Sequence, residues 1–270
     1  MGLASTSTIQ PIPVTRRFLR KINVEHSTMD RICEFLGETI GTALLVFLGC
    51  TGCAHDKNIE NSPILSQINI ALVVIAMVQC FGCVSGAHLN PAITLAVYVY
   101  DMISFKMTIA YFIAQILGAY LGYGLMLMLI PPSAISWEGA AHSVCIPSRN
   151  PDITVNQAFC IEFIITALVI FTTCSAADAR NAALQDSMPI RFGIVIVCAG
   201  LTAGPLTGAN INPAKALAAA TWMSDYENLW LYCSAPMSGA AVSSIFYKLV
   251  FKREFVDTNQ MEKVEQMSKR

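Results

Sequence analysis

The stretch GAHLNPAITLA, residues 86–96, returns in altered form as GANINPAKALA at residues 208–218. Each copy follows a long apolar run, and each carries Asn-Pro-Ala near its middle. Asn is a favoured N-cap of helices, and Pro is favoured at the first helical position, where its missing N–H has no helical partner to lose. Asn90 and Asn212 are therefore expected to begin one helix each.

The two helices predicted by these caps are short, covering about residues 92–99 and 214–222. A helix that spans a bilayer needs about 20 apolar residues, so neither helix can cross a membrane alone. Asn-Pro is a common turn dipeptide, and one copy would indicate little. Two copies in equivalent places predict a central role for six residues: Asn90, Pro91, Ala92, Asn212, Pro213 and Ala214.

The composition favours a membrane protein. Of 270 residues, 54% are hydrophobic and 13% are charged, and the mean hydropathy is +0.55. Soluble domains carry about 25% charged residues. The net charge of −1 gives no reason to expect a nucleic-acid partner. Six apolar runs have the length of membrane spans, and the fifth is the weakest because Gly204-Pro205 cuts it short: 32–50, 65–84, 107–130, 158–176, 190–204 and 229–251.

The repeat extends over most of the chain. ETIGTALLVF at 38–47 matches EFIITALVIF at 162–171, and YFIAQILGA at 111–119 matches YCSAPMSGA at 232–240. Each half holds three spans, an odd number, so the second half enters the membrane from the opposite face. This inverted repeat predicts an all-α membrane protein with six transmembrane helices and two re-entrant half-helices, with its site at the interface of the repeats.

The expected domain organisation is a channel domain over 30–252, in which a loop at 131–157 joins repeat 30–130 to repeat 158–252. Tails precede it at 1–29 and follow it at 253–270. Basic residues gather on one side of the predicted spans, with only Lys57 and Arg149 on the other, Lys215 being considered separately. The positive-inside rule then predicts that both tails are cytoplasmic. We expect a multi-pass protein of the plasma membrane.

The two half-helices have a shared electrostatic consequence. Entering from opposite faces, their N-termini meet near the middle of the membrane, and each carries about half a positive charge. Cations and protons should meet a barrier there, whereas neutral molecules should not. The amides of Asn90 and Asn212 add hydrogen-bond donors for a passing water or hydroxyl group.

The two boxes SGAHLNPAIT and TGANINPA, the Glu of the first and fourth spans, and YxxAQxxGA resemble the aquaporin (major intrinsic protein) family over about 30–252. The resemblance implies a pore in each monomer and a homotetramer in lipid. It also implies that Glu38 and Glu162 brace the re-entrant loops through backbone N–H groups, with a structural role rather than a proton relay. His88 is expected to join this support.

The resemblance places the outer constriction, or selectivity filter, at Ile70, Gly200, Ala209 and Lys215, with Ala71 as an alternative to Ile70. Water channels of the family commonly carry an aromatic, a His, a small residue and an Arg there. The missing His resembles an insect branch that conducts glycerol. Without that ring the constriction should be wider and less polar, and Lys should still repel cations. Alternatively, Lys215 snorkels to the mouth and leaves a plain wide pore.

The expected function is passive passage of water and small neutral solutes such as glycerol and urea. A strictly water-selective channel is the alternative within the same class. A secondary transporter or a non-conducting junction protein is the alternative from another class. No metal or cofactor site and no catalytic constellation appears in the sequence, so an enzyme is not expected. Cys53 and Cys145 lie in loops on one side, where a bridge between them is possible.

Overall fold

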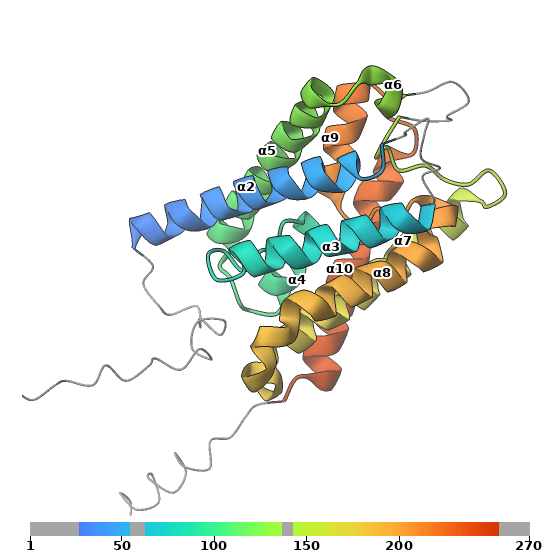
Figure 1. The fold of residues 1–270 in the computed structure, drawn as a ribbon. Coiled ribbons are helices and arrows are strands. Elements are labelled where there is room, and N and C mark those ends of the chain that lie inside the picture. Colours follow the sequence, from blue (N-terminus) through green and yellow to red (C-terminus); the bar gives the residue numbers. More distant parts are fainter. Residues whose placement is uncertain (1–26, 55–62, 137–142, 254–270) are drawn as a thin grey trace, which may run out of the picture.

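The computed structural model describes residues 27–54, 63–136 and 143–253. Nearly all of the predicted tails, and Lys57, lie outside these ranges. The described secondary structure is helical (Figure 1). In chain order it comprises α2 (Thr28–Thr51), α3 (Pro63–Phe81), α4 (Pro91–Val99), α5 (Phe105–Leu129), α6 (Pro132–Ile135), α7 (Val155–Ala177), the 3₁₀ segment η1 (Ala179–Ser187), α8 (Met188–Thr207), α9 (Pro213–Met223), α10 (Leu229–Phe246) and the π-helical η2 (Tyr247–Phe251).

The predicted set of six long and two short helices is confirmed. Five described segments are long and apolar enough to cross a membrane: α2, α3 from Ile64, α5, α7, and η1 together with α8. The sixth long helix, α10, has 18 residues but is less apolar because it contains several serines and Pro236. Ser234 and Ser244 donate to carbonyls one turn back in the same helix, which satisfies their hydroxyls without water.

Helix packing follows the repeat. Helix α2 packs on α5 in the first half, as α7 packs on α10 in the second. Helices α3 and α8 pack on each other across the two halves. Each short helix also packs on the last helix of the other half, α4 on α10 and α9 on α5 (Figure 1). These exchanged contacts are those of an inverted repeat whose halves interlock.

Glycine permits close contacts of this kind at equivalent places in the two repeats. A Cβ on Gly118 of α5 would lie 2.3 Å from the carbonyl oxygen of Thr39 in α2. A Cβ on Gly239 of α10 would lie 2.8 Å from the carbonyl oxygen of Phe163 in α7. In the membrane small residues allow helix backbones to approach closely, and packing then supplies the attraction that water would otherwise provide.

Helix α8 is longer than predicted, because Pro205 lies inside it and Gly204-Pro205 does not end it. Proline removes one helical N–H, but the loop before α7 supports this turn from outside. The backbone N–H of Asn150 donates to the Leu206 carbonyl at 2.8 Å, and its side chain donates to the Pro205 carbonyl at 3.3 Å. The helix ends at Gly208, which adopts the left-handed conformation with φ of 78°.

The cysteine bridge differs from the one considered from sequence. Cys145 is joined to Cys50, with 5.5 Å between the Cα atoms, and Cys53 is free. Helix α2 extends to Thr51, so Cys50 occupies its last turn, while the Cys53 thiol donates to the Gly49 carbonyl at 3.3 Å. We call this end of the bundle the disulfide end. The opposite end, where α2 begins and η2 ends, is called the basic end (Figure 1).

A buried carboxylate holds the loop before each short helix. Glu38 of α2 accepts from the backbone N–H groups of His88 at 2.9 Å and Leu89 at 2.8 Å. Glu162 of α7 accepts from those of Asn210 at 2.9 Å and Ile211 at 3.0 Å. Both glutamates are fully buried. They pair backbone donors that the non-helical loops would otherwise leave unsatisfied at membrane depth.

The two loops share an unusual backbone. Ala87 and Leu89 in the first, and Ala209 and Ile211 in the second, all have positive φ, between 47° and 58°. A positive φ raises the conformational energy of a non-glycine residue, so this conformation persists only where the surrounding structure fixes it. Leu89 and Ile211 are themselves donors to Glu38 and Glu162, and Ala87 and Ala209 each precede a donor, so the carboxylates and the strained backbone depend on each other.

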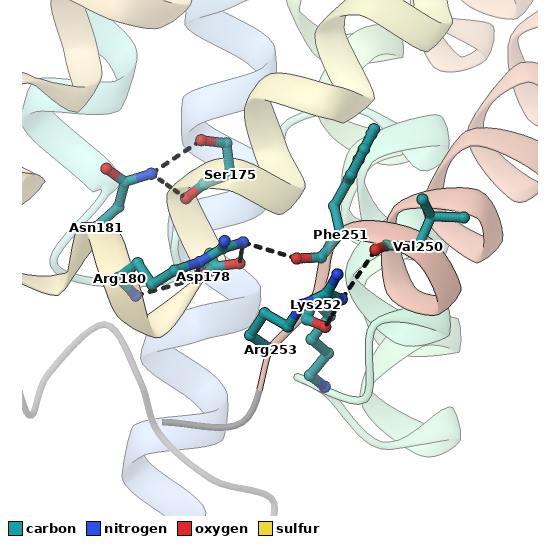
Figure 2. A network of polar contacts seen from close by, with 8 residues as sticks. All are labelled: Ser175, Asp178, Arg180, Asn181, Val250, Phe251, Lys252 and Arg253. Carbon is teal, nitrogen blue, oxygen red and sulfur yellow. Dashed lines mark hydrogen bonds and ion pairs between the residues drawn. The ribbon is translucent and has the colours of Figure 1, made fainter. Parts of the chain in front are cut away.

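Polar contacts fasten the end of η2 at the basic end (Figure 2). The guanidinium of Arg180 in η1 donates to Asp178 at 2.6 Å and to the Phe251 carbonyl at 2.7 Å. The Asp178 side chain is only 2% exposed, and the Arg180 guanidinium holds its pKa below the ordinary value. On the other side, Lys248 pairs with Asp101 at 2.7 Å. The end of the last helix is thus tied to both halves.

Replacing either loop-bracing carboxylate by an amide should destabilise the fold. In Glu38→Gln or Glu162→Gln, the new NH₂ group faces at least one buried backbone N–H, which loses its acceptor. The expected cost is about 1–3 kcal/mol of unfolding free energy. Thermal unfolding in detergent would measure it. Glu227→Gln, at an exposed position, is the control, and an equal loss there would contradict the bracing role.

Arg180→Ala should weaken the protein at neutral pH more than in acid. Because the folded-state pKa of Asp178 is depressed, its pairing contributes stability above the unfolded-state pKa of about 4 and loses it as the pH falls below. The unfolding temperatures of Arg180→Ala and the unmutated protein should therefore differ at pH 7 and converge near pH 3. Arg191→Ala, which removes no ion pair between described residues, should show no such convergence.

Candidate functional site

The two short helices meet at their N-termini, each capped as predicted. The side-chain oxygen of Asn90 accepts from the Ala92 N–H, and that of Asn212 accepts from the Ala214 N–H. Each amide nitrogen also crosses to the other half: Asn90 donates to the Ile211 carbonyl at 3.3 Å, and Asn212 donates to the Leu89 carbonyl at 2.9 Å. Each amide keeps a second N–H for another acceptor.

The field at this junction is positive without a charged side chain. Two helix N-termini point toward one place, and each contributes about half an elementary charge. The carboxylates of Glu38 and Glu162 lie behind the loops, where their oxygens are occupied by the donors described above. The junction therefore favours the oxygen atoms of neutral molecules and disfavours cations.

A cavity of about 750 Å³ passes this junction. Its wall includes Asp30 and Lys106 at the basic end, Asn90 and Asn212 at the junction, and Lys215 at the disulfide end. The cavity lies along α2 from Asp30 to the Cys50–Cys145 bridge. With 24 residues at 1.5 Å per residue, α2 is about 36 Å long. The cavity thus extends along a length comparable with the thickness of a bilayer.

The middle of the cavity is largely apolar with a few polar places. From α3 it is lined by Ile70, Val74 and Val78, and from α8 by Phe192 and Ile196. Polar groups come from the Asn caps, from the loop backbone and from Lys215. Such a wall offers a small polar molecule hydrogen bonds at a few points and weak adhesion elsewhere, which suits passage better than retention.

Of the four filter positions, the structure brings three to the cavity. Ile70, Ala209 and Lys215 line it, and Gly200 does not. Ala71, the alternative to Ile70, is 1% exposed and lies toward α8, where its carbonyl is 3.4 Å from the place of a Gly193 Cβ. Lys215 is partly buried in the cavity wall, beside the disulfide, so the geometry favours the inward of the two orientations considered for it.

The space at Gly200 is filled by Gln67 of α3. A Cβ on Gly200 would lie 2.3 Å from the Gln67 side-chain oxygen. Gly200 therefore contacts Gln67 and does not line the cavity, and a constriction widened by the missing ring stays a prediction. Gln67 was not singled out from the sequence. The available signal was an amide inside an otherwise apolar run, and nothing in the sequence pairs it with a glycine far along the chain.

The supports of the two loops are not equal. His88 joins the first, as expected, through its backbone N–H and a 3.2 Å contact of its ring with Thr94. Gln115 donates to both Glu38 and Thr94 at 2.7 Å. The repeat carries Pro236 where the first half has Gln115, so Glu162 lacks this donor. The role of Gln115 was not predicted from the sequence, although the comparison of the two repeats aligns Gln115 with Pro236.

A metal site is not found among the described residues: no cluster of three or more His, Cys, Asp or Glu side chains is suited to hold an ion. The buried acids Glu38 and Glu162 instead accept hydrogen bonds from the loops.

Known proteins share this architecture. The structure of the aquaglyceroporin from Plasmodium falciparum matches with a TM-score of 0.68 and 28% identity, over 82% of this chain and 96% of that one. Aquaporin-4 of Mus musculus is 31% identical over 218 residues, 79% of this chain, and nodulin-26 of Glycine max is 32% identical over 219 residues, 80% of this chain. The match covers 77% of nodulin-26 and 66% of aquaporin-4, slightly under two thirds of the latter.

The family model described as major intrinsic protein matches residues 25–247, which include both Asn-Pro-Ala turns and every long helix. Together with the relatives at 30% identity or more, this match leaves one conclusion. The chain belongs to the major intrinsic protein, or aquaporin, family.

Proposed function

We propose that the protein is a passive channel for water and small neutral solutes, including glycerol and urea. One observation carries the proposal: a cavity with residues from both ends of the bundle in its wall runs between the two Asn caps. A solute moving along it exchanges water for the free amide N–H groups of Asn90 and Asn212. It meets no deep binding site, and flux through such a path need not saturate.

Ion exclusion follows from the same geometry. A cation that reaches the caps faces two helix N-termini and has lost much of its hydration in the apolar wall. The protonated amine of Lys215 adds positive charge on the disulfide side of the caps. Water that accepts hydrogen bonds from both Asn amides is oriented away from donating to its neighbours, which interrupts proton hopping. Neutral molecules are spared both penalties.

The proposed solute range rests on the walls of the filter. Ile70 and Ala209 provide no aromatic ring and no polar group, and Lys215 is a point charge rather than a planar fork. An apolar face opposite a donor suits glycerol, which has a carbon backbone and hydroxyls. A structural relative is named an aquaglyceroporin, which agrees with this range. A strictly water-selective channel is the alternative that the flux measurement decides.

Ion-coupled transport is less well supported. A coupled transporter needs a titratable group facing its substrate, and the acids beside the junction, Glu38 and Glu162, lie behind the loops with their oxygens occupied by loop donors. A junction protein without conduction would not require an open cavity past the caps.

The proposal places the protein in the plasma membrane as a homotetramer with the basic end in the cytoplasm. The described basic residues support that orientation: Arg31, Lys106, Arg180, Arg191, Lys248, Lys252 and Arg253 lie toward the basic end, and Arg149 and Lys215 lie toward the other. Large apolar side chains that remain more than one third exposed in the monomer, such as Ile40, Leu121 and Ile164, supply the surface for lipid and neighbouring subunits.

Conduction can be measured in liposomes. Purified protein should speed shrinkage under a sucrose gradient well beyond protein-free vesicles, and should speed re-swelling under glycerol and then urea gradients. The fluxes should rise linearly with solute concentration. Saturating glycerol flux would indicate a transporter. Water movement without glycerol or urea entry would indicate a strict water channel, and no acceleration of either would contradict conduction altogether.

Lys215→Met should weaken ion exclusion while keeping the pore open. Removing this positive charge from the cavity wall should raise the proton leak, followed with a pH-sensitive dye, by only roughly threefold to tenfold, because the helix dipoles remain. Lys106→Met, which removes a lysine from the other end of the same cavity, is the matched control. An unchanged leak in Lys215→Met, or the same rise in Lys106→Met, would contradict the role given to Lys215.

A further inference from the structure

The Cys50–Cys145 bridge forms part of the wall of the cavity. Both cysteines line the cavity at the disulfide end, together with Ile70, Ala209 and Lys215. Cys145 is partly exposed, whereas Cys50 is buried. A reagent that enters the cavity from this end can therefore meet the bridge, with Cys145 as the partner that it reaches first.

A positive charge stands beside the bridge. Cys50 packs in one cluster with Ala214 and Ala218, which flank Lys215 on α9, and Cys145 packs against the same cluster. The protonated amine of Lys215 attracts anions into this part of the cavity, and a positive charge favours the thiolate form of a nearby cysteine. Negatively charged sulfur reagents should therefore gather here, and a thiol released from the bridge should react with them.

The chain around Cys145 has anchors that do not depend on the bridge. On one side the Val144 carbonyl accepts from the Tyr123 hydroxyl at 2.8 Å, and on the other the Asn150 N–H donates to the Leu206 carbonyl at 2.8 Å. Cys145 itself has a positive φ of 64°, which persists only where the surrounding structure fixes it. Opening the bridge therefore releases Cys145 while both anchors remain, so its thiol should become free without unfolding of the segment.

We propose that the Cys50–Cys145 bridge is a redox-controlled modification site in the solute path. A small-molecule thiol opens it, and the released Cys145 thiolate then takes a small anionic sulfur electrophile, such as an organic disulfide. The added group obstructs the path beside Lys215. While the bridge is closed, the site is protected from such reagents. This inference rests on the proposed channel function and deepens it by naming a chemical control of conduction.

The chemistry is thiol–disulfide exchange in two stages. A thiolate of the reductant attacks the Cys145 sulfur, and the Cys50 sulfur leaves with the bonding electron pair and takes a proton. A second reductant thiolate attacks the mixed disulfide and releases the Cys145 thiolate, so that two reductant thiols become one disulfide. The Cys145 thiolate then attacks the electrophile, forms a new S–S bond and expels a thiolate or a sulfinate.

Flux measurements in liposomes, with and without prior reduction, test the site. The unmutated protein is treated on both sides of the vesicle with 2-sulfonatoethyl methanethiosulfonate, either directly or after anaerobic reduction with dithiothreitol and its removal. By mass spectrometry, Cys145 should gain the sulfonatoethyl group only after reduction. Water and glycerol fluxes should then fall below those of the directly treated sample, in proportion to the labelled fraction, and dithiothreitol should restore them.

Two variants serve as matched controls. Cys50→Ser leaves Cys145 as a free thiol, so the reagent should slow both fluxes without prior reduction. Cys50→Ser/Cys145→Ser keeps the free Cys53, and also Cys33 and Cys83, which line the cavity at the basic end. In this double variant, reduction before the reagent should add no block to that of the reagent alone.

The charge beside the site has its own test. The anionic reagent should label reduced Cys145 faster than 2-(trimethylammonium)ethyl methanethiosulfonate, a cation with the same reactive group. Lys215→Met should narrow this difference, whereas Lys106→Met, at the other end of the cavity, should preserve it.

Absence of the label on Cys145 after reduction would overturn the inference, and so would labelled protein with unchanged fluxes. An equal additional block in the double variant would also overturn it, because the block would then arise at another thiol. If the unlabelled protein speeds neither water nor glycerol movement, the proposed function fails and the claimed obstruction fails with it. The mass measurement still decides, in that case, whether the bridge is reactive.

Discussion

The crossed hydrogen bonds of Asn90 and Asn212 are the interaction on which the molecule depends. Each asparagine caps the helix of its own half with its oxygen and holds a loop carbonyl of the other half with its nitrogen. The amide nitrogen of each cap asparagine therefore finds its hydrogen-bond acceptor in the opposite repeat. The exchanged packing of α4 on α10 and α9 on α5 follows from the same need. The two similar halves form one unit because the cap asparagine of each half donates a hydrogen bond to a loop carbonyl of the other half.

Burying two carboxylates beside this junction is costly unless every oxygen has a partner. The loops meet that condition by turning successive N–H groups inward through backbone conformations with positive φ. Glu38 and Glu162 thus convert strained, non-helical chain into a rigid part of the wall. The negative charge stays behind the loop and the helix N-termini stay in front. This division keeps both of these carboxylates out of the cavity wall at the junction, and the acidic residues that do line the cavity, Asp30 and Glu34, lie near the start of α2.

The sequence predicted what local chemistry and repetition determine. Asn-Pro identified both short helices, the matching stretches identified the inverted repeat, and apolar length identified the six long helices. It could not predict contacts that depend on where a helix ends or on which distant side chain fills a gap. Cys50 rather than Cys53 pairs with Cys145 because α2 reaches Thr51. Pro205 stays helical because Asn150 supports its turn, and Gly200 is covered because Gln67 crosses from α3.

The unequal bracing of the two loops has a consequence for motion. Glu38 receives donors from Ser85, two backbone groups and Gln115, whereas Glu162 has Thr207 and two backbone groups, and the nearby Tyr232 hydroxyl has no partner among the described residues. Local opening begins where the fewest contacts must break. Amide hydrogens of Asn210 and Ile211 should therefore exchange with solvent before those of His88 and Leu89. Fluctuations of the channel wall should then start on the loop that leads into α9, the helix that carries Lys215, so that the second repeat opens more easily than the first.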